Sequence, residues 1–153
     1  MDDMIKQAKL KALSLLNYSD RTESQLRQKL KENSFEEEAI EKAVAYVKSF
    51  GYVNDKGYAQ RYILNKQGTK SKREIYASLC QKGISRAVVE EAIEEFYEGE
   101  NELMTIQKLC VKKHYDAGHA TEEEKRRMYQ FLVRKGFRNE DIYRALNFEG
   151  REY

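Results

Sequence analysis

The chain has 153 residues, of which 35% are charged and 41% are hydrophobic, and its formal net charge is +2. This apolar content is enough for a folded core, and the absence of proline, with only eight glycines, favours long stretches of helix. The N-terminus is charged and no apolar run is long enough to span a membrane, so we exclude a membrane protein and expect a cytoplasmic one.

The first third of the chain predicts three helices. Apolar residues at helical spacing mark the first helix, which carries Ile5, Ala8, Ala12 and Leu15. Thr22 and Gln25 form a capping box that begins the second helix. The third helix presents a core face that consists of Ile40, Ala43, Val44, Val47 and Phe50.

A helix like the second one occurs twice more. Aligning Leu30 with Leu79 and Leu132 gives offsets of 49 and 53 residues, and the neighbouring apolar positions then coincide as well. Such a period indicates a tandem helical repeat. We therefore predict an all-α protein of three tandem three-helix repeats that form an elongated, curved molecule. The predicted repeats cover residues 1–50, 51–99 and 100–153.

Helix caps occur at related positions in the later repeats. Ser71 and Glu74 form the capping box of the middle repeat. In the third repeat Thr121 and Glu124 lie one turn earlier, so the helix from residue 122 to residue 135 should be about a turn longer. The second helices end at residues suited to a left-handed turn, which are Ser34, Gly83 and Gly136.

The remaining helices continue this pattern. The third helix of the middle repeat presents a core face of Val89, Ala92, Ile93 and Phe96. The last repeat begins with a helix that carries Leu103, Ile106 and Leu109, and its last helix ends near Leu146. The cysteines lie among apolar helical residues, and we expect both Cys80 and Cys110 to be small buried hydrophobes.

The loop HYDAGHAT contains both histidines of the chain, His114 and His119, with Asp116 between them. Because no further His or Cys pair completes a tetrahedral set, we interpret it as a polar loop and not as a zinc site. The sequence also has no nucleophile, phosphate-loop or dinucleotide-binding motif. We therefore expect no catalysis, no metal and no cofactor.

Basic residues recur in register in the second and third repeats. In the alignment of these repeats, Arg73 corresponds to Arg126 and Lys82 corresponds to Lys135. Cations spaced in this way suit an array of phosphates or a carboxylate-rich protein groove, whereas an ordinary solvated helix face is the competing interpretation. The predicted partner-binding residues, two tyrosines included, are Lys70, Lys72, Arg73, Tyr76, Lys82, Arg86, Arg126, Tyr129, Arg134 and Lys135.

The segment GYVNDKGYAQRYI (residues 51–63), followed by REIYASLCQKGI (residues 73–84), resembles the RecX family, bacterial regulators of the recombinase RecA. A related LKENSF segment precedes it and FLVRKGF follows it, so the resemblance covers nearly the whole chain. The sequence departs from the family at Asn54, where the family more often has an acidic residue, and in the turn QGTKS.

The resemblance implies a non-enzymatic protein of three three-helix repeats, and we expect this protein to be a monomer. It implies binding to RecA–DNA filaments within their groove, with inhibition of ATP hydrolysis, strand exchange and coprotease action. It also implies weak, non-specific binding to single- and double-stranded DNA, and a role in homologous recombination, DNA repair and the SOS response.

Two other functions fit the same sequence. The repeats could act as helix-turn-helix modules with the helix at residues 122–135 as the reader, although three glutamates at its start would face phosphate. A helical scaffold for another acidic partner is the second alternative. An assay with RecA separates both from the leading interpretation.

We expect EDTA and added zinc to leave the melting temperature unchanged, because the histidine loop lacks a complete ligand set. Metal analysis of protein purified without chelator checks this. Stoichiometric zinc that disappears in a variant carrying His114→Ala and His119→Ala would contradict the prediction.

Overall fold

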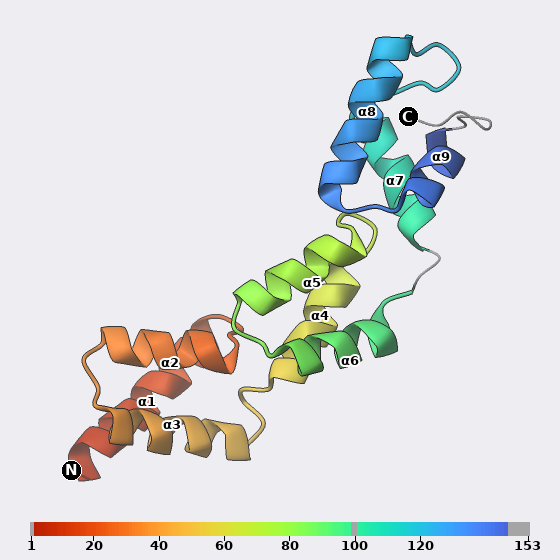
Figure 1. Ribbon diagram of the computed structural model, residues 1–153. Helices are drawn as coiled ribbons and strands as arrows, with labels where there is room; N and C mark the ends of the chain where they lie inside the picture. The colour runs from red at the N-terminus through yellow and green to blue at the C-terminus, as the bar shows by residue number, and fades with distance from the viewer. Residues whose placement is uncertain (1, 99–100, 147–153) are drawn as a thin grey trace. The chain divides into compact units, whose positions relative to one another are not determined.

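The computed structural model describes residues 2–98 and 101–146. Within these ranges the regular elements are helical, apart from an isolated bridge between Gln67 and Lys70. The all-α class, with three helices to each repeat, is confirmed. None of these helices has both the length and the apolar character needed to cross a membrane. The helices are α1 (Asp2–Tyr18), α2 (Glu23–Glu32), α3 (Glu37–Ser49), α4 (Asp55–Lys66), α5 (Lys72–Gln81), α6 (Arg86–Phe96), α7 (Asn101–Lys112), α8 (Glu122–Lys135) and α9 (Asn139–Leu146), labelled in Figure 1.

The chain divides into two compact units. The first contains Met1–Arg61 and Leu79–Ala92, and the second contains Tyr62–Ser78 and Ile93–Tyr153. Helices α4, α5 and α6 therefore contribute residues to both units. The predicted repeat boundaries, after residues 50 and 99, stay a prediction.

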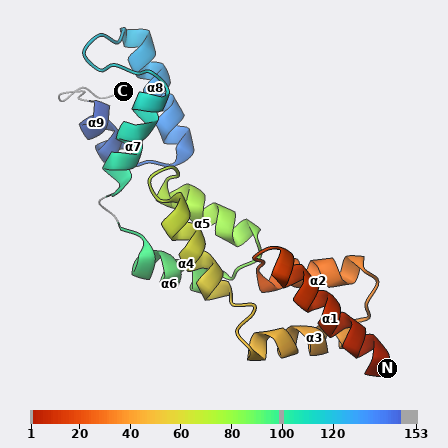
Figure 2. The ribbon, with the colours of Figure 1, turned by 180° about the vertical axis from the view of Figure 1, so that it is seen from behind.

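In the first unit α1 lies across α2 and α3, behind them in Figure 1 and in front of them in Figure 2. Ala8 and Ala12 on α1 are fully buried, and their small side chains let the helices approach closely. The other buried residues of this core are Leu26, Leu30, Ala39, Ile40, Ala43, Val44, Val47 and Val53. The predicted core faces of α2 and α3 are thus confirmed as far as Val47.

In the second unit α7, α8 and α9 enclose a separate apolar core. Its buried residues are Ile106, Cys110, Met128, Leu132, Phe137, Ile142 and Leu146. Cys110 is buried as predicted, and burial raises the pKa of its thiol. Cys80 is only half-buried, so its predicted full burial is wrong.

The predicted helix ends are confirmed. Thr22 forms a reciprocal capping box with Gln25 at the start of α2. The three residues that follow the second helices have left-handed φ angles, 66° at Ser34, 91° at Gly83 and 96° at Gly136. Helix α8 has 14 residues against 10 in α2 and in α5, which matches the predicted extra turn.

Two predicted core residues lie outside the core. Phe50 is 56% exposed, because α3 ends at Ser49 and the Phe50 ring instead stacks on Tyr52 with centroids 5.5 Å apart. Phe96, the last residue of α6, is half-buried, while the next residue, Tyr97, is buried. Both errors arise at helix ends, where the helical period no longer decides which side chain faces inward.

A buried hydroxyl joins the start of α2 to residues of the middle repeat. Thr22 is fully buried, and its Oγ1 donates a 2.7 Å hydrogen bond to the Lys82 carbonyl while it accepts one from the N–H of Gln25. The N–H of Glu23 donates to Oδ1 of Asp55 at 2.8 Å. We name these contacts the first joint, which consists of Thr22, Glu23, Ser24, Asp55, Lys82 and Gly83.

Contacts of the same kind recur in the second unit, where Ser71 and Lys135 occupy the positions equivalent to Thr22 and Lys82. The buried Ser71 hydroxyl donates to the Lys135 carbonyl and accepts from the N–H of Glu74. The N–H of Lys72 donates to Oε1 of Glu102 at 3.0 Å. We name these contacts the second joint, which consists of Ser71, Lys72, Arg73, Glu102, Lys135 and Gly136.

Each joint also requires a glycine for two reasons. The φ angles of +91° at Gly83 and +96° at Gly136 disfavour any residue with a Cβ. In addition, a Cβ at Gly136 would lie 2.8 Å from the Cβ of Arg73, and one at Gly83 would overlap the side chain of Ser24. The close approach at the joint therefore depends on these two positions.

We predict that Gly136→Ala lowers the free energy of unfolding by about 1 to 3 kcal/mol, through backbone strain and the contact with Arg73. Urea denaturation measures the change. The matched control is Gly118→Ala, where a Cβ would meet Oδ1 of Asp116 at an ordinary 3.5 Å. Equal stability of the two alanine variants would show that the second joint tolerates a Cβ.

We predict a pH-dependent contribution from Glu23. A 2.8 Å contact with Lys48 Nζ, followed by one with Arg27 at 3.2 Å, holds the pKa of Glu23 below its ordinary value. A lowered carboxylate pKa stabilises the fold above the pKa of the unfolded chain, and this stabilisation is lost as the pH falls through the folded pKa.

Glu23→Gln should therefore cost about 1 kcal/mol or less at pH 7, and the difference from the wild type should shrink in acid. Urea denaturation of both proteins from pH 7 down to about pH 3 checks this. Replacing Lys48 with Met should remove part of the same pH dependence. A wild-type advantage that is constant over the whole range would contradict the prediction.

Candidate partner-binding surface

The ten predicted partner-binding residues are distributed over both units. Lys82 and Arg86 lie in the first unit, and the other eight lie in the second. No finding tests their contact with a partner, so the set stays a prediction. Within the second unit, the contacts of each residue show which side chains have structural roles and which face solvent.

Two of the predicted cations belong to the second joint. The Arg73 side chain covers the position where Gly136 lacks a Cβ. Lys135 is half-buried, and its Nζ lies 3.5 Å from Oε2 of Glu74 and 5.3 Å from the ring centroid of Phe131. These side chains hold the joint together, whatever else they contact.

The tyrosines and Lys70 also have partners within the fold. Tyr129 stacks on Tyr143 with centroids 5.7 Å apart, and its hydroxyl donates to Asn139 at 2.9 Å. Lys70 Nζ donates to the Tyr62 hydroxyl at 3.2 Å. Tyr76 is half-buried. Contact of a partner with the Tyr129 ring would therefore compete with the packing of this ring against Tyr143 of α9.

The predicted cations on α8 lie on different faces of the helix. Arg126 and Lys135 are nine residues apart, which places them on opposite sides of a helix at about 100° per residue. Arg127 and Arg134 are seven residues apart and therefore share one face. Both of these arginines are exposed.

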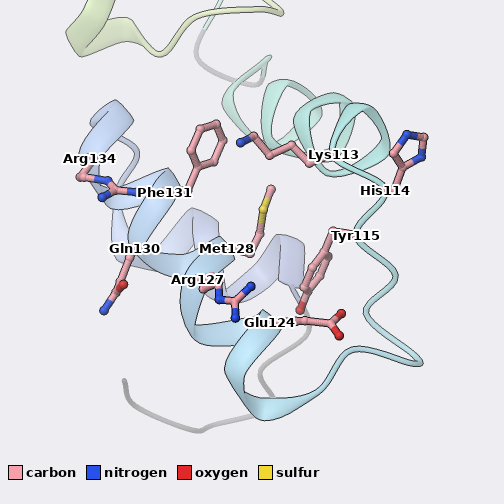
Figure 3. A pocket seen from close by; sticks show the side chains of 9 residues that line it. All are labelled: Lys113, His114, Tyr115, Glu124, Arg127, Met128, Gln130, Phe131 and Arg134. Carbon is pink, nitrogen blue, oxygen red and sulfur yellow. The ribbon is translucent and has the colours of Figure 1, made fainter.

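The shared face of Arg127 and Arg134 forms one side of a pocket of about 420 Å³. Figure 3 shows the side chains of α8 and of the segment that follows α7 arranged around it. Buried Met128 and half-buried Phe131 and Tyr115 provide its apolar surface. The residues that line the pocket are Lys113, His114, Tyr115, Glu124, Arg127, Met128, Gln130, Phe131 and Arg134.

The lining of this pocket carries more positive than negative charge. The Lys113 ammonium lies 3.9 Å from the ring centroid of Phe131, a cation–π contact. Arg127 pairs with Glu123 at 2.8 Å, and this hydrogen bond raises the pKa of Arg127 and lowers that of Glu123. Arg134 extends along the opposite end of the pocket from Glu124 in Figure 3.

Arg134 belongs to the predicted partner-binding set, whereas the other lining residues Lys113, Arg127 and Phe131 do not. The seven-residue spacing of the two arginines was a usable signal, because it places both on one helix face. Lys113 lies one residue beyond the end of α7, so only the folded structure brings it against Phe131.

The histidine loop forms a local polar turn. Nδ1 of His119 lies 2.8 Å from Oδ2 of Asp116, and this contact holds the pKa of Asp116 below its ordinary value. His114 has a left-handed φ of 58° at the end of α7. Among the residues that the structure describes, no three His, Cys, Asp or Glu side chains gather in a way that could hold a metal ion.

Comparison with known families identifies each repeat. Residues 8–46 match the first three-helix domain of RecX, residues 54–93 match the second, and residues 100–146 match the third. A protein of Caldanaerobacter subterraneus subsp. tengcongensis named "Regulatory protein RecX" is 36% identical over 143 residues, which are 93% of this chain and 70% of the relative.

Solved structures agree with these matches. A crystal structure of a regulatory protein RecX is 28% identical, with a TM-score of 0.81 over 97% of this chain and 73% of the other. The crystal structure of RecX from Lactobacillus salivarius has a TM-score of 0.78 at 24% identity, over 96% of this chain and 97% of the other. The second likeness shows a common fold.

Proposed function

This chain belongs to the RecX family, and from that membership we propose that it is a negative regulator of a RecA recombinase. The proposal is that it binds RecA–DNA filaments in their groove and inhibits their ATPase, strand-exchange and coprotease activities. It would act in the cytoplasm, as a monomer, in homologous recombination, DNA repair and the SOS response. The relatives named as regulatory proteins support a regulatory role.

Occupancy of the groove is the simplest mechanism for such a protein. The described residues hold no gathered set of metal ligands, and the sequence has no catalytic motif, so inhibition would come from binding alone. A helical protein that fills the groove would oppose the rearrangement of filament subunits. Inhibition should then be stoichiometric with the bound protein, and not catalytic.

Weak DNA binding would accompany this role through exposed cations. The first turn of α8 contains Glu122, Glu123 and Glu124, which oppose the approach of phosphate to that helix end. The charges there make α8 a poor reader of base sequence. Contacts with DNA would instead be non-specific and salt-sensitive.

The test is a RecA ATPase assay on single-stranded DNA with a charge-reversal variant. The best positions are predicted partner-binding cations that are exposed and lie outside the pocket of Figure 3, namely Lys72, Arg86 and Arg126. Lys72 takes part in the second joint only through its main-chain N–H, so its exposed side chain can be exchanged. Reversal of all three to Glu should abolish inhibition with little change in melting temperature, because exposed charges contribute little to folding and repeatedly to association.

The matched control reverses three other exposed lysines, Lys6, Lys42 and Lys112, and so makes the same change in net charge. It should inhibit like the wild type. If the wild-type protein does not inhibit RecA at all, the proposed function is wrong. If the test variant inhibits as well as the control, the predicted basic surface is not the contact.

A further inference from the structure

We propose that the pocket between α8 and the end of α7 is the docking site for a partner polypeptide segment that carries a large apolar side chain beside carboxylates. This inference rests on the proposed function, and it names the surface and the chemistry by which a protein partner would be held. The pocket lies wholly within the second unit.

The shape and the polarity of the pocket fit such a segment. Its volume of about 420 Å³ can take one or two side chains. Met128 is 5% exposed and lies between Phe131 and Tyr115, so these three residues offer an apolar surface for a Phe or Leu of the partner. Exposed hollows with such a floor and a charged rim are typical of protein interaction sites.

The charges of the pocket select an acidic segment. Lys113, Arg127 and Arg134 line it against a single carboxylate, that of Glu124. Glu124 and Arg134 are ten residues apart on α8, about 15 Å along the helix axis, so the negative end and the positive end are separated. A segment can place its carboxylates beside Arg134 and Lys113 and keep them away from Glu124.

A polypeptide fits this pocket better than a nucleic acid strand does. A strand carries a phosphate at every nucleotide and would have to pass Glu123 and Glu124.

The repeat itself shows that this part of a second helix can receive a polypeptide. In the first two repeats the hydroxyls of Thr22 and Ser71 contact a main-chain carbonyl that comes from the following repeat. With the same offset of 53 residues, the position of Ser71 corresponds to Glu124 and that of Glu74 corresponds to Arg127. Both of these residues are exposed and line the pocket.

Fluorescence anisotropy with the full chain tests the proposal. The probe is a fluorescein-labelled peptide in which one Phe lies between runs of Asp and Glu. Wild-type protein should bind it, and reversing Lys113 and Arg134 to Glu should weaken binding at least about tenfold. The same peptide with Ser in place of Phe should bind more weakly to the wild type.

The matched control reverses Lys108 and Lys112, which are exposed on α7 and do not line the pocket. It should bind the peptide like the wild type, and circular dichroism should show equal helix content in all variants. Labelled oligothymidylate serves as the competing probe. If the pocket variant loses oligothymidylate but binds the peptide normally, the pocket takes nucleic acid and the proposal is overturned.

Absence of peptide binding by the wild type, or equal binding by the pocket variant and the control, also overturns it. Failure of the docking proposal can be distinguished from failure of the proposed function. Wild-type inhibition of the RecA ATPase tests the function alone, whereas the peptide titration tests the pocket without RecA. A pocket variant that still inhibits RecA fully would remove the pocket from the mechanism and leave the function standing.

Discussion

A single buried hydroxyl at each joint is the interaction on which the arrangement of the repeats depends. Thr22 and Ser71 are both fully buried, and each hydroxyl accepts from an N–H in the first turn of its own helix while it donates to a carbonyl of the next repeat. One side-chain oxygen thus satisfies a helix start and a helix end that are distant in sequence. A buried polar group left without a partner costs about 1 to 3 kcal/mol. Loss of either hydrogen bond of the hydroxyl would therefore destabilise the joint.

The joints also give some of the basic residues around them a structural role. Lys82 and Lys135 contribute the acceptor carbonyls, and Arg73 packs where Gly136 has no side chain. Any residue can supply a main-chain carbonyl, so only the side-chain contacts of Arg73 at Gly136 and of Lys135 with Glu74 give these cations a structural role that requires no partner. Cations such as Arg126, which lie outside the joints and face solvent, carry clearer information about binding.

The caps and the left-handed turns could be predicted from the sequence, because each depends on residues within about five positions of one another. The repeat could be predicted because the same local pattern recurs at offsets of 49 and 53 residues. The second role of Ser71 could not, since its acceptor is 64 residues away. Phe50 was misplaced because it follows the last turn of α3, where helical periodicity no longer applies. The alignment matched Arg126 to Arg73 but had no basic counterpart for Arg127, because Glu74 occupies the corresponding position in the middle repeat.

The pocket arises where the third repeat departs from the other two. Helix α8 begins one turn earlier than the repeat requires, at the exposed cap Thr121, so the position of the buried hydroxyl falls inside the helix and is taken by Glu124. The Glu124 side chain is exposed, and the face that a joint would cover turns into the wall of the pocket. In this three-helix repeat the start of the second helix can therefore either form a joint with the following repeat or leave an open surface. The residue at which that helix begins determines which of the two occurs.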